Sequence, residues 1–538
     1  MGTQKNLTHR NIDFYVKKEN KRNLFPHIEL CAFQISETPF FNCKELCLYV
    51  FKKNTQTGER NFNKKTMKNH ITKIVVFAIL ITTLISCKVS KDIETPKDAF
   101  PENFRNAAVS KDTTSIGDLE WKNFYTEKDI VQLIDSAIAR NNDLQIATKN
   151  LEIAQYRFTQ SKWGNVPQVN LGITASSSNP SDNSFTGMNL NQALGAKHID
   201  DFSAGATLSW EADIWGKIKN QKKGAFAAYL QSEEVKKALQ TNIVANVSRG
   251  YYNLLMLDAQ LDIARQNVKL NDSTTNIIKL KYAAGQTTSL AIQQSEAQKL
   301  NSEQLIPLLE QNIAIQENAL SVLTGSFPSS KQRTALLNSV AVKNNNTVGI
   351  PASLVSRRPD VKSAELELKI ANANVGITKA DLYPTLRITA QGGVNSFETS
   401  TWFNIPASLF GTVAGGLTQP LLNNKRLKTQ YNIAVAEREK AVINFRQSVL
   451  IAVSEVADAL VVTEKLQQQE NFLQQKVKTL QQAIKNANLL FKNGMAEYLE
   501  VLTAQANLLQ SELELADIKR QQLTANTELY RALGGGWK

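Results

Sequence analysis

The chain has 538 residues but only four cysteines and four histidines, and most of these lie near its amino terminus. Beyond residue 86 it keeps one cysteine, Cys87, and one histidine, His198. Within a single chain, this scarcity excludes internal disulfides and metal sites built from cysteine and histidine. The sequence also lacks G-x-S-x-G, H-E-x-x-H and phosphate-loop motifs, so we expect no enzyme activity and no cofactor.

The most apolar run near the amino terminus is too short to form a membrane-spanning helix. The run from Ile74 to Ile85 covers 12 residues, whereas a spanning helix needs about 20. Lys68 and Lys73 precede it, which is the layout of a secretory signal. Its end, Leu84 to Cys87, resembles a bacterial lipobox, in which the cysteine is lipidated. A short buried helix is the alternative.

A secretory signal does not begin 66 residues into a chain, so Met67 is the expected initiator. Residues 1–66 are then an upstream extension, predicted to be disordered, and residues 67–86 the signal peptide. The extension contributes +6 and the signal +2 to the formal net charge of +13, which leaves +5 for residues 87–538. Because most of the basic excess lies outside the mature chain, we predict no nucleic-acid partner.

The remaining chain repeats itself. Residues Asp143–Pro167 and Asp360–Pro384 align without a gap, and seven of the 25 positions are identical, where unrelated stretches share about two. A second register, offset by 209 residues, pairs Gly285 with Gly494. The period is far longer than the 20 to 50 residues typical of solenoids, so a duplicated domain is expected.

Glycine and proline are absent, or nearly so, from long stretches of both copies. Segments of such composition, rich in Ala, Gln, Lys, Glu and Leu, predict very long helices. Each copy is expected to carry a helical hairpin that turns at a glycine, Gly285 or Gly494, and the hairpins are expected to pack as in coiled coils. The predicted helices are Lys217–Ala284, Gln286–Thr324, Leu421–Asn493 and Met495–Leu533.

Two short strands per copy are predicted between the helices. In the first, Gln168, Asn170 and Gly172 alternate with apolar residues, which suits the wall of a membrane β-barrel. Four strands cannot close a barrel, since the smallest common ones use eight, but a trimer supplies twelve. A small soluble sheet is the alternative. The predicted strands are Val166–Ser176, Ala204–Trp210, Pro384–Gly392 and Thr412–Leu421, and loops at Ser176–His198 and Asn395–Phe410 are expected to face outside.

The segment Gly349–Val361 resembles the P-x-x-L-x-x-R-R-P-D signature of the TolC-like outer-membrane efflux family, in its lipoprotein branch serving RND-type pumps. The resemblance implies a mostly α, tandem-duplicated protomer. Its long hairpins form a periplasmic α-barrel, and its four strands contribute to a trimeric 12-stranded transmembrane β-barrel. Supporting matches are Trp121–Leu144, Ala380–Thr385, Thr418–Leu421 and Arg531–Trp537.

On this resemblance the chain divides into a lipid-anchored extension, two efflux repeats and an equatorial linker between them. The implied function is that of an outer-membrane exit duct, which passively passes small molecules from an inner-membrane RND-type pump and a periplasmic adaptor to the exterior. The implied partners are two further copies of the chain, the adaptor, the pump and outer-membrane lipid. The segments are 87–120 (extension), 121–325 (first repeat), 326–353 (linker) and 354–538 (second repeat).

The resemblance also assigns roles at the hairpin tips. The turns are expected to meet the adaptor, and Leu499 fits an apolar gate ring. Thr503 stands where relatives often place an acid, so an ionic latch there is not expected, and Leu499 serving as ordinary hairpin packing is the alternative. The predicted adaptor contacts are Ala284, Gly285, Gln286, Asn493, Gly494 and Met495.

A structural role is predicted for Arg357, Arg358, Pro359 and Asp360. Proline suits the first turn of a helix, and an acid is favourable near its positive end. The arginines are expected to bind carbonyls or carboxylates around that end. The alternative function for the whole chain is a lipid-anchored periplasmic scaffold or binding lipoprotein without a channel, which shares Cys87 and the long helices but needs neither strands nor a trimer.

Overall fold

The computed structural model describes residues 104–105, 115–342, 348–349 and 351–538. All of them belong to one compact unit of the chain, Leu80–Lys538. Cys87, the signal peptide and the upstream extension lie outside the described residues, so the statements about them stay predictions.

The two copies fold into the same series of elements. Each has a helix of about twenty residues, two strands, a helix of 67 residues and a helix of 35 residues. The first copy contains α5 (Asn142–Lys162), β1 (Gln168–Ser178), β2 (Ile199–Ala212), α7 (Lys217–Ala283) and α8 (Ser289–Leu323). The second contains α10 (Pro359–Ala380), β3 (Thr385–Ser396), β4 (Leu409–Thr418), α11 (Arg426–Lys492) and α12 (Tyr498–Ala532).

The four long helices confirm the prediction made from the lack of glycine and proline. At 1.5 Å per residue, α7 and α11 are each about 100 Å long. Gly250 lies inside α7 because the neighbouring helix comes close: a Cβ there would be 2.7 Å from Leu320 Cδ2. Pro307 lies inside α8 without ending it.

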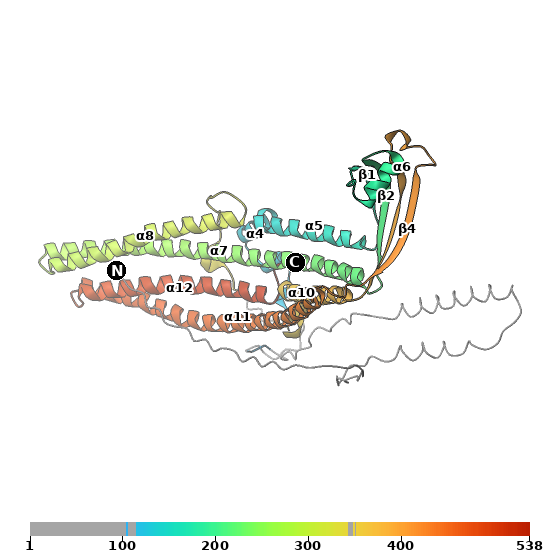
Figure 1. The fold of residues 1–538 in the computed structure, drawn as a ribbon. Coiled ribbons are helices and arrows are strands. Elements are labelled where there is room, and N and C mark those ends of the chain that lie inside the picture. The colour runs from blue at the N-terminus through green and yellow to red at the C-terminus, as the bar shows by residue number, and fades with distance from the viewer. Residues whose placement is uncertain (1–103, 106–114, 343–347, 350) are drawn as a thin grey trace, which may run out of the picture. The chain divides into compact units, whose positions relative to one another are not determined.

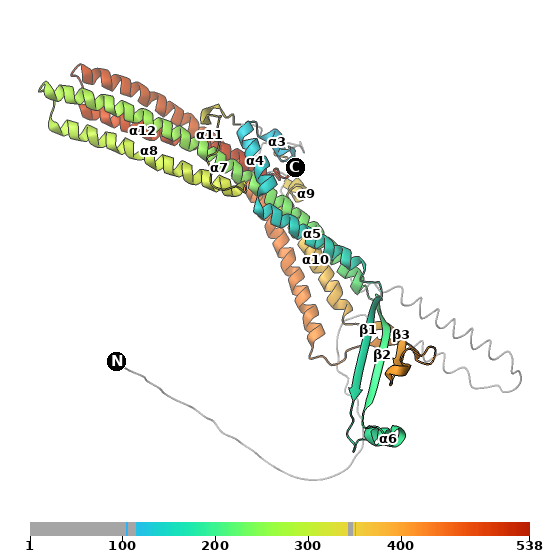
Figure 2. The same cartoon turned by 90° about the horizontal axis from the view of Figure 1, so that it is seen from above.

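The hairpins of the two copies lie side by side, with the sheet at the end away from their turns (Figures 1 and 2). Helix α7 contacts α8 on one side and α12 on the other, and α12 contacts α11. Nearer the sheet, α5 packs on α7, and α10 packs between α7 and α11. Among the described residues, none of the helices combines the length and the apolarity of a membrane-spanning segment.

The four strands form one antiparallel sheet in the order β1-β2-β3-β4. The middle pairing, β2 with β3, joins the two copies, and it begins with Phe202 opposite Ser396 and ends with Ala212 opposite Leu386. The strands are displaced by a few residues from the predicted ranges, and β2 is longer because it pairs along its length with two neighbours.

The prediction of a plain loop at Ser176–His198 is wrong, because this connection contains helix α6 (Phe185–Leu194). Its amino-terminal end is capped by Ser184, whose Oγ accepts a hydrogen bond from the Gly187 N–H at 3.1 Å. Its other end is closed by Gly195 in the left-handed conformation, with φ +61°. Ser184 and Gly195 are common helix caps. The surrounding segment is rich in Asn and Ser, a composition typical of loops, so the helix was not predicted.

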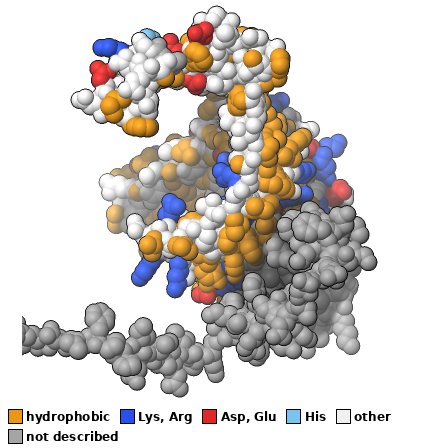
Figure 3. Space-filling view, turned by 45° about the vertical axis from the view of Figure 1, so that its right-hand side comes forward, with side chains coloured by type: hydrophobic (Ala, Val, Ile, Leu, Met, Phe, Trp, Pro, Cys, Tyr) orange, Lys and Arg blue, Asp and Glu red, His pale blue; other side chains and the backbone are white. Residues whose placement is uncertain are grey.

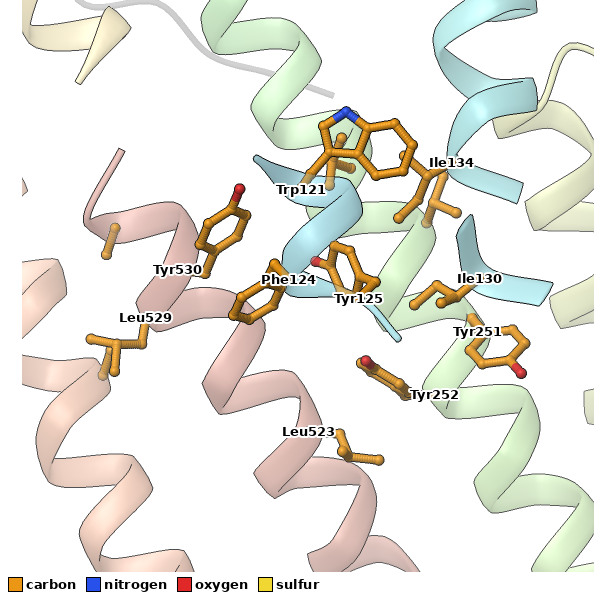
Figure 4. Packing of buried hydrophobic residues seen from close by; sticks show 14 of the residues in the cluster. Trp121, Phe124, Tyr125, Ile130, Ile134, Tyr251, Tyr252, Leu523, Leu529 and Tyr530 are labelled. Atoms are coloured by element: carbon orange, nitrogen blue, oxygen red, sulfur yellow. The ribbon is translucent and has the colours of Figure 1, made fainter. Parts of the chain in front are cut away.

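The main core lies where short amino-terminal helices cover the long ones (Figure 4). Phe124 stacks on Tyr530 of α12 with ring centroids 4.1 Å apart, and Ile130 and Ile134 are fully buried. The Tyr530 hydroxyl donates to the Leu119 carbonyl at 2.6 Å. These contacts join the two ends of the described fold. The amino-terminal helices are α3 (Trp121–Phe124) and α4 (Lys128–Arg140). Other short elements of the described chain are α9 (Leu354–Arg357) and 3-10 turns at Ile116–Asp118, Leu337–Ser339, Pro351–Ser353 and Thr399–Thr401.

Candidate functional site

The sheet has one apolar face and one polar face along its whole width. Residues opposite each other in an antiparallel pair share a face, and the face alternates along a strand. One row across the four strands is Val169, Leu208, Ala390 and Val413, and the adjacent row is Asn170, Thr207, Gln391 and Thr412. Val413 is 80% exposed and Val169 61% exposed. The apolar face is therefore open at both outer strands, and its side chains gather along one side of the sheet in Figure 3.

Both outer strands have a free edge within the described residues, because β1 pairs only with β2 and β4 only with β3. Strand β1 follows α5, and β4 precedes α11. The free edges are therefore continuous with two helical flanks: α5 and α8 on one side of α7, and α11 on the other.

Both flanks carry exposed apolar residues at spacings that include steps of seven, which is the pattern of a coiled-coil seam. Such a surface is suited to packing against another helix. The exposed residues are Ile146, Ile153, Tyr156 and Trp163 on or directly after α5, Leu300, Leu308, Ile315 and Val322 on α8, and Ile433, Ile443 and Leu450 on α11.

The two hairpin turns have the same geometry. Gly285 and Gly494 each have φ +73° and follow the C-cap residues Ala284 and Asn493. The Gln286 N–H donates to the Lys281 carbonyl at 2.8 Å, and the Met495 N–H to the Leu490 carbonyl at 2.9 Å. This is the glycine-closed helix end that the sequence predicted. A Cβ at either glycine would have no atom within 4 Å, so both turns are open to solvent.

A polar cleft of about 800 Å³ lies between the two tips. Lys281 lies over the Phe491 ring, 4.1 Å from its centroid, and donates to the Phe491 carbonyl. The Tyr498 hydroxyl donates to Gln294 Oε1 at 2.8 Å. These contacts connect two tips that are about 200 residues apart in the sequence. The other residues that line the cleft are Gln286, Thr287, Thr288, Lys492, Asn493, Gly494, Ala496 and Glu497.

Leu499 and Thr503 lie on the exposed surface of α12 just above the tip. Leu499 is 53% exposed, whereas Val501, two residues further on, is fully buried against Ile278, Ala291 and Phe491. Ordinary packing inside the hairpin is therefore the role of Val501 and not of Leu499. The gate role of Leu499 stays a prediction.

The arginine motif binds three segments of the chain together. Pro359 is the first residue of α10 and Asp360 lies in its first turn. Arg358, which is 3% exposed, holds Asp360 through two hydrogen bonds of 3.0 and 2.6 Å. It also donates to Glu455 of α11 at 2.7 Å and to the Ala532 carbonyl at the end of α12 at 3.1 Å. Arg357 forms an ion pair of 2.8 Å with Asp118.

Burial disfavours the charged forms of both members of the Arg358–Asp360 pair, but their contact outweighs it. The hydrogen bonds and charge of Arg358 lower the pKa of Asp360 below its ordinary value. The hydrogen bonds and charges of Asp360 and Glu455 raise the pKa of Arg358. The motif is thus a charged clamp that holds the ends of α10 and α12 against α11.

The sequence reasoning missed the apolar flanks and the cleft between the tips. The seven-residue spacing of Ile146 and Ile153, repeated at Tyr156 and Trp163, is a signal that could have identified the first flank. The cleft has no such signal, because it depends on how two distant hairpins pack.

A sheet with one apolar face, one polar face and free edges is suited to form part of a membrane β-barrel. The family model for outer membrane efflux proteins matches residues 133–326 and 350–535. The chain belongs to this family, whose members are channel proteins rather than enzymes, and it is an outer-membrane efflux channel whose helical part extends into the periplasm. The resemblance found in the sequence is thereby confirmed.

Individual relatives agree with this assignment. The cation efflux system protein CusC of Escherichia coli O6:H1 is 27% identical over 472 residues, covering 87% of this chain and 99% of the relative. Outer membrane protein OprJ of Pseudomonas aeruginosa is 28% identical over 474 residues, covering 86% of this chain and 96% of the relative. A crystal structure of CusC matches with a TM-score of 0.74 at 26% identity, covering 84% of this chain and 100% of that one.

Proposed function

We propose that three copies of this chain close one channel, which is the passive exit duct of a tripartite efflux system. The observation that carries the proposal is the two-faced sheet with two free edges. Because the strands alternate in direction, β1 and β4 run antiparallel to each other. The β4 edge of one copy is therefore suited to pair with the β1 edge of the next.

Three copies joined in this way supply twelve strands, enough to close a barrel. The apolar row of Val169 and Val413 then faces lipid and the row of Asn170 and Thr412 faces water. The apolar flank of α5 and α8 meets the α11 flank of the next copy along the helical part. In this head-to-tail arrangement each copy contacts the next, and the last copy contacts the first, so that the copies form a closed ring.

We further propose that the hairpin tips contact a periplasmic adaptor, which links the duct to an inner-membrane RND-type pump. The open turns at Gly285 and Gly494 leave the backbone accessible to a close partner. The cleft between them offers Lys281, Lys492 and Glu497 for hydrogen bonds and ion pairs. The pump supplies the energy, and the duct supplies the path.

The decisive test is the native mass of the protein extracted from outer membranes in detergent. We expect three times the mass of one chain, because four strands leave two unpaired edges in a monomer. A monomer would contradict the shared barrel and would favour the lipid-anchored scaffold.

The anchored scaffold is also distinguished by replacing Cys87 with alanine. A barrel-forming protein stays in the outer membrane without its lipid, because the apolar face of the sheet still holds it there. A scaffold attached mainly by acyl chains is released into the periplasm. We expect retention, measured by fractionating cells that make the Cys87→Ala variant; its appearance in the periplasmic fraction would contradict the channel.

Leu499 is proposed to narrow the periplasmic end of the channel as an apolar ring. Such a constriction hinders ions because water leaves a narrow apolar pore. We expect Leu499→Ala to raise the single-channel conductance of the reconstituted protein several-fold. Thr503→Ala is the matched control one turn further on and should change conductance less; equal conductance in Leu499→Ala and wild type would refute the ring.

A further inference from the structure

The connection between β1 and β2, residues 179–198, reaches over the polar side of the sheet. Figure 3 shows apolar side chains along one side of the sheet and an overhang at its outer end that extends toward the opposite side. Figure 1 places α6 in this overhang, beside the ends of β1 and β2. The helix therefore lies on the side that the proposed function assigns to the channel interior.

The other connection, between β3 and β4, is placed differently. Trp402 packs against Phe202 with ring centroids 5.7 Å apart. Phe202 lies on the apolar face, because it is two residues from Ala204 and six from Leu208 in β2. The aromatic residues of this connection are thus on the side assigned to lipid, and only the α6 connection extends over the interior.

Helix α6 is held firmly at its amino-terminal end. Ser184 Oγ donates to the Ser181 carbonyl at 2.7 Å while it accepts from the Gly187 N–H. A Cβ at Gly187 would lie 2.2 Å from the Ser181 oxygen, so this helix face is packed tightly against the preceding turn. These contacts fix the first turn of α6 on the segment that precedes it and leave the opposite face of the helix open.

That opposite face begins with apolar side chains that the described residues leave largely or half exposed. Phe185 is 79% exposed and Met188, one turn later, is 49% exposed, whereas Leu190 is 8% exposed. Lipid does not cover them, because lipid contacts the other side of the sheet. In a ring of copies, the α6 helices of the copies face one another across the channel interior.

We infer that α6 is a contact between copies of this chain at the outer mouth of the channel, where Phe185 and Met188 of the copies approach one another and form an apolar constriction. The inference rests on the proposed ring. The polar face below this ring carries Asp201, Glu211 and Arg387 besides uncharged polar residues, so the apolar ring is what narrows the outer exit, in the way that dewetting closes hydrophobic pores. The duct would then be restricted at both ends.

Distances between copies test this placement directly. Nitroxide labels are attached to single cysteines at Gln192, Thr174 or Ile173 in the full chain, with Cys31, Cys43 and Cys47 replaced by serine. Gln192 lies on the exposed face of α6 and leaves Phe185 and Met188 intact, whereas Thr174 and Ile173 are adjacent residues on the polar and apolar faces of β1. We expect the shortest distance between copies at Gln192, a longer one at Thr174 and the longest at Ile173.

The outcomes separate the inference from the proposed function. A shorter distance at Thr174 than at Ile173, with Gln192 as far apart as Thr174 or farther, keeps the ring and overturns the constriction. A Gln192 distance as large as that at Ile173 places α6 at the membrane rim against lipid and also overturns it. A Thr174 distance no shorter than that at Ile173 overturns the proposed orientation of the sheet itself.

Access from outside provides a second test. In intact cells, a bulky maleimide should modify Thr174→Cys slowly, and several-fold faster when Phe185 and Met188 are both replaced by serine. Phe403→Ser, in the connection on the lipid side, is the matched control and should leave the rate unchanged. Equal rates with and without the α6 substitutions would overturn the constriction.

Discussion

Replacing Gly494 with tryptophan is expected to abolish export while trimers still form. Gly494 has φ +73°, and no atom lies within 4 Å of a Cβ placed there. The indole would therefore project outward without a clash inside the protomer and would occupy the position of the adaptor. A side chain in the left-handed conformation costs about 1–2 kcal/mol, which a turn at the end of a 67-residue helix tolerates.

Export is measured as ethidium efflux from cells that also make the partner adaptor and pump, and trimers as native mass. Gly494→Asn is the matched control, because asparagine adopts the left-handed conformation with little cost and is small. We expect Gly494→Asn to export normally and Gly285→Trp, in the equivalent turn, to fail as Gly494→Trp does. Normal efflux in both tryptophan variants would show that the tips do not contact the adaptor.

The long helices were predictable because their cause is local. Residues 426–492 contain no glycine or proline, and their composition favours a helix without help from neighbours. The positions of the turns were predictable for the same reason, since Gly285 and Gly494 are the residues that tolerate positive φ. The two-faced strand was also predictable, from the alternation of Asn170 with its apolar neighbours.

Features that depend on contacts between copies of the repeat were not predictable. Val501 and Leu499 are both apolar and two residues apart, and only the packing of α7 and α11 determines which one is buried. Helix α6 was missed for a different reason: its two caps lie within a polar segment whose composition is that of a loop.

The partners of Arg358 are 2, 97 and 174 residues away in the sequence, so the motif identified Arg358 but not the groups that it binds.

Replacing Arg358 with alanine is expected to cause the largest loss of stability of any single substitution considered. The side chain is buried and joins Asp360, Glu455 and the Ala532 carbonyl. Its removal leaves a cavity, an unpaired carbonyl and two carboxylates without their shared cation. Breaking a fully buried ion pair costs about 3–5 kcal/mol. Because the side chains of Asp360 and Glu455 are 50% and 31% exposed, the loss is expected at the lower end of that range or below it. Arg358→Lys keeps the charge but cannot form the two-point contact with Asp360, so a smaller loss is expected.

The measurement is the temperature at which detergent-extracted trimers dissociate and unfold. Arg357→Ala is the matched control: it removes the neighbouring arginine, which is 16% exposed against 4% for Arg358. Arg357 contacts Asp118 and the Ser353 hydroxyl, and because it is less buried than Arg358, a smaller loss is expected. An Arg358→Ala variant as stable as Arg357→Ala would contradict the clamp.

The pH dependence of the stability lost in Arg358→Ala shows how much of that loss comes from the ion pair with Asp360. The pKa of Asp360 is lower in the folded protein than its ordinary value, because the contact with Arg358 outweighs the cost of burial. A lowered folded pKa contributes stability that is fully present above the unfolded value of about 3.9 and is lost as the pH falls through the folded value. The difference in stability between wild type and Arg358→Ala should therefore be constant from neutral pH down to about pH 4 and shrink below it. A difference that does not change at acidic pH would mean that Arg358 acts by packing and by its bond to the Ala532 carbonyl, and not through Asp360.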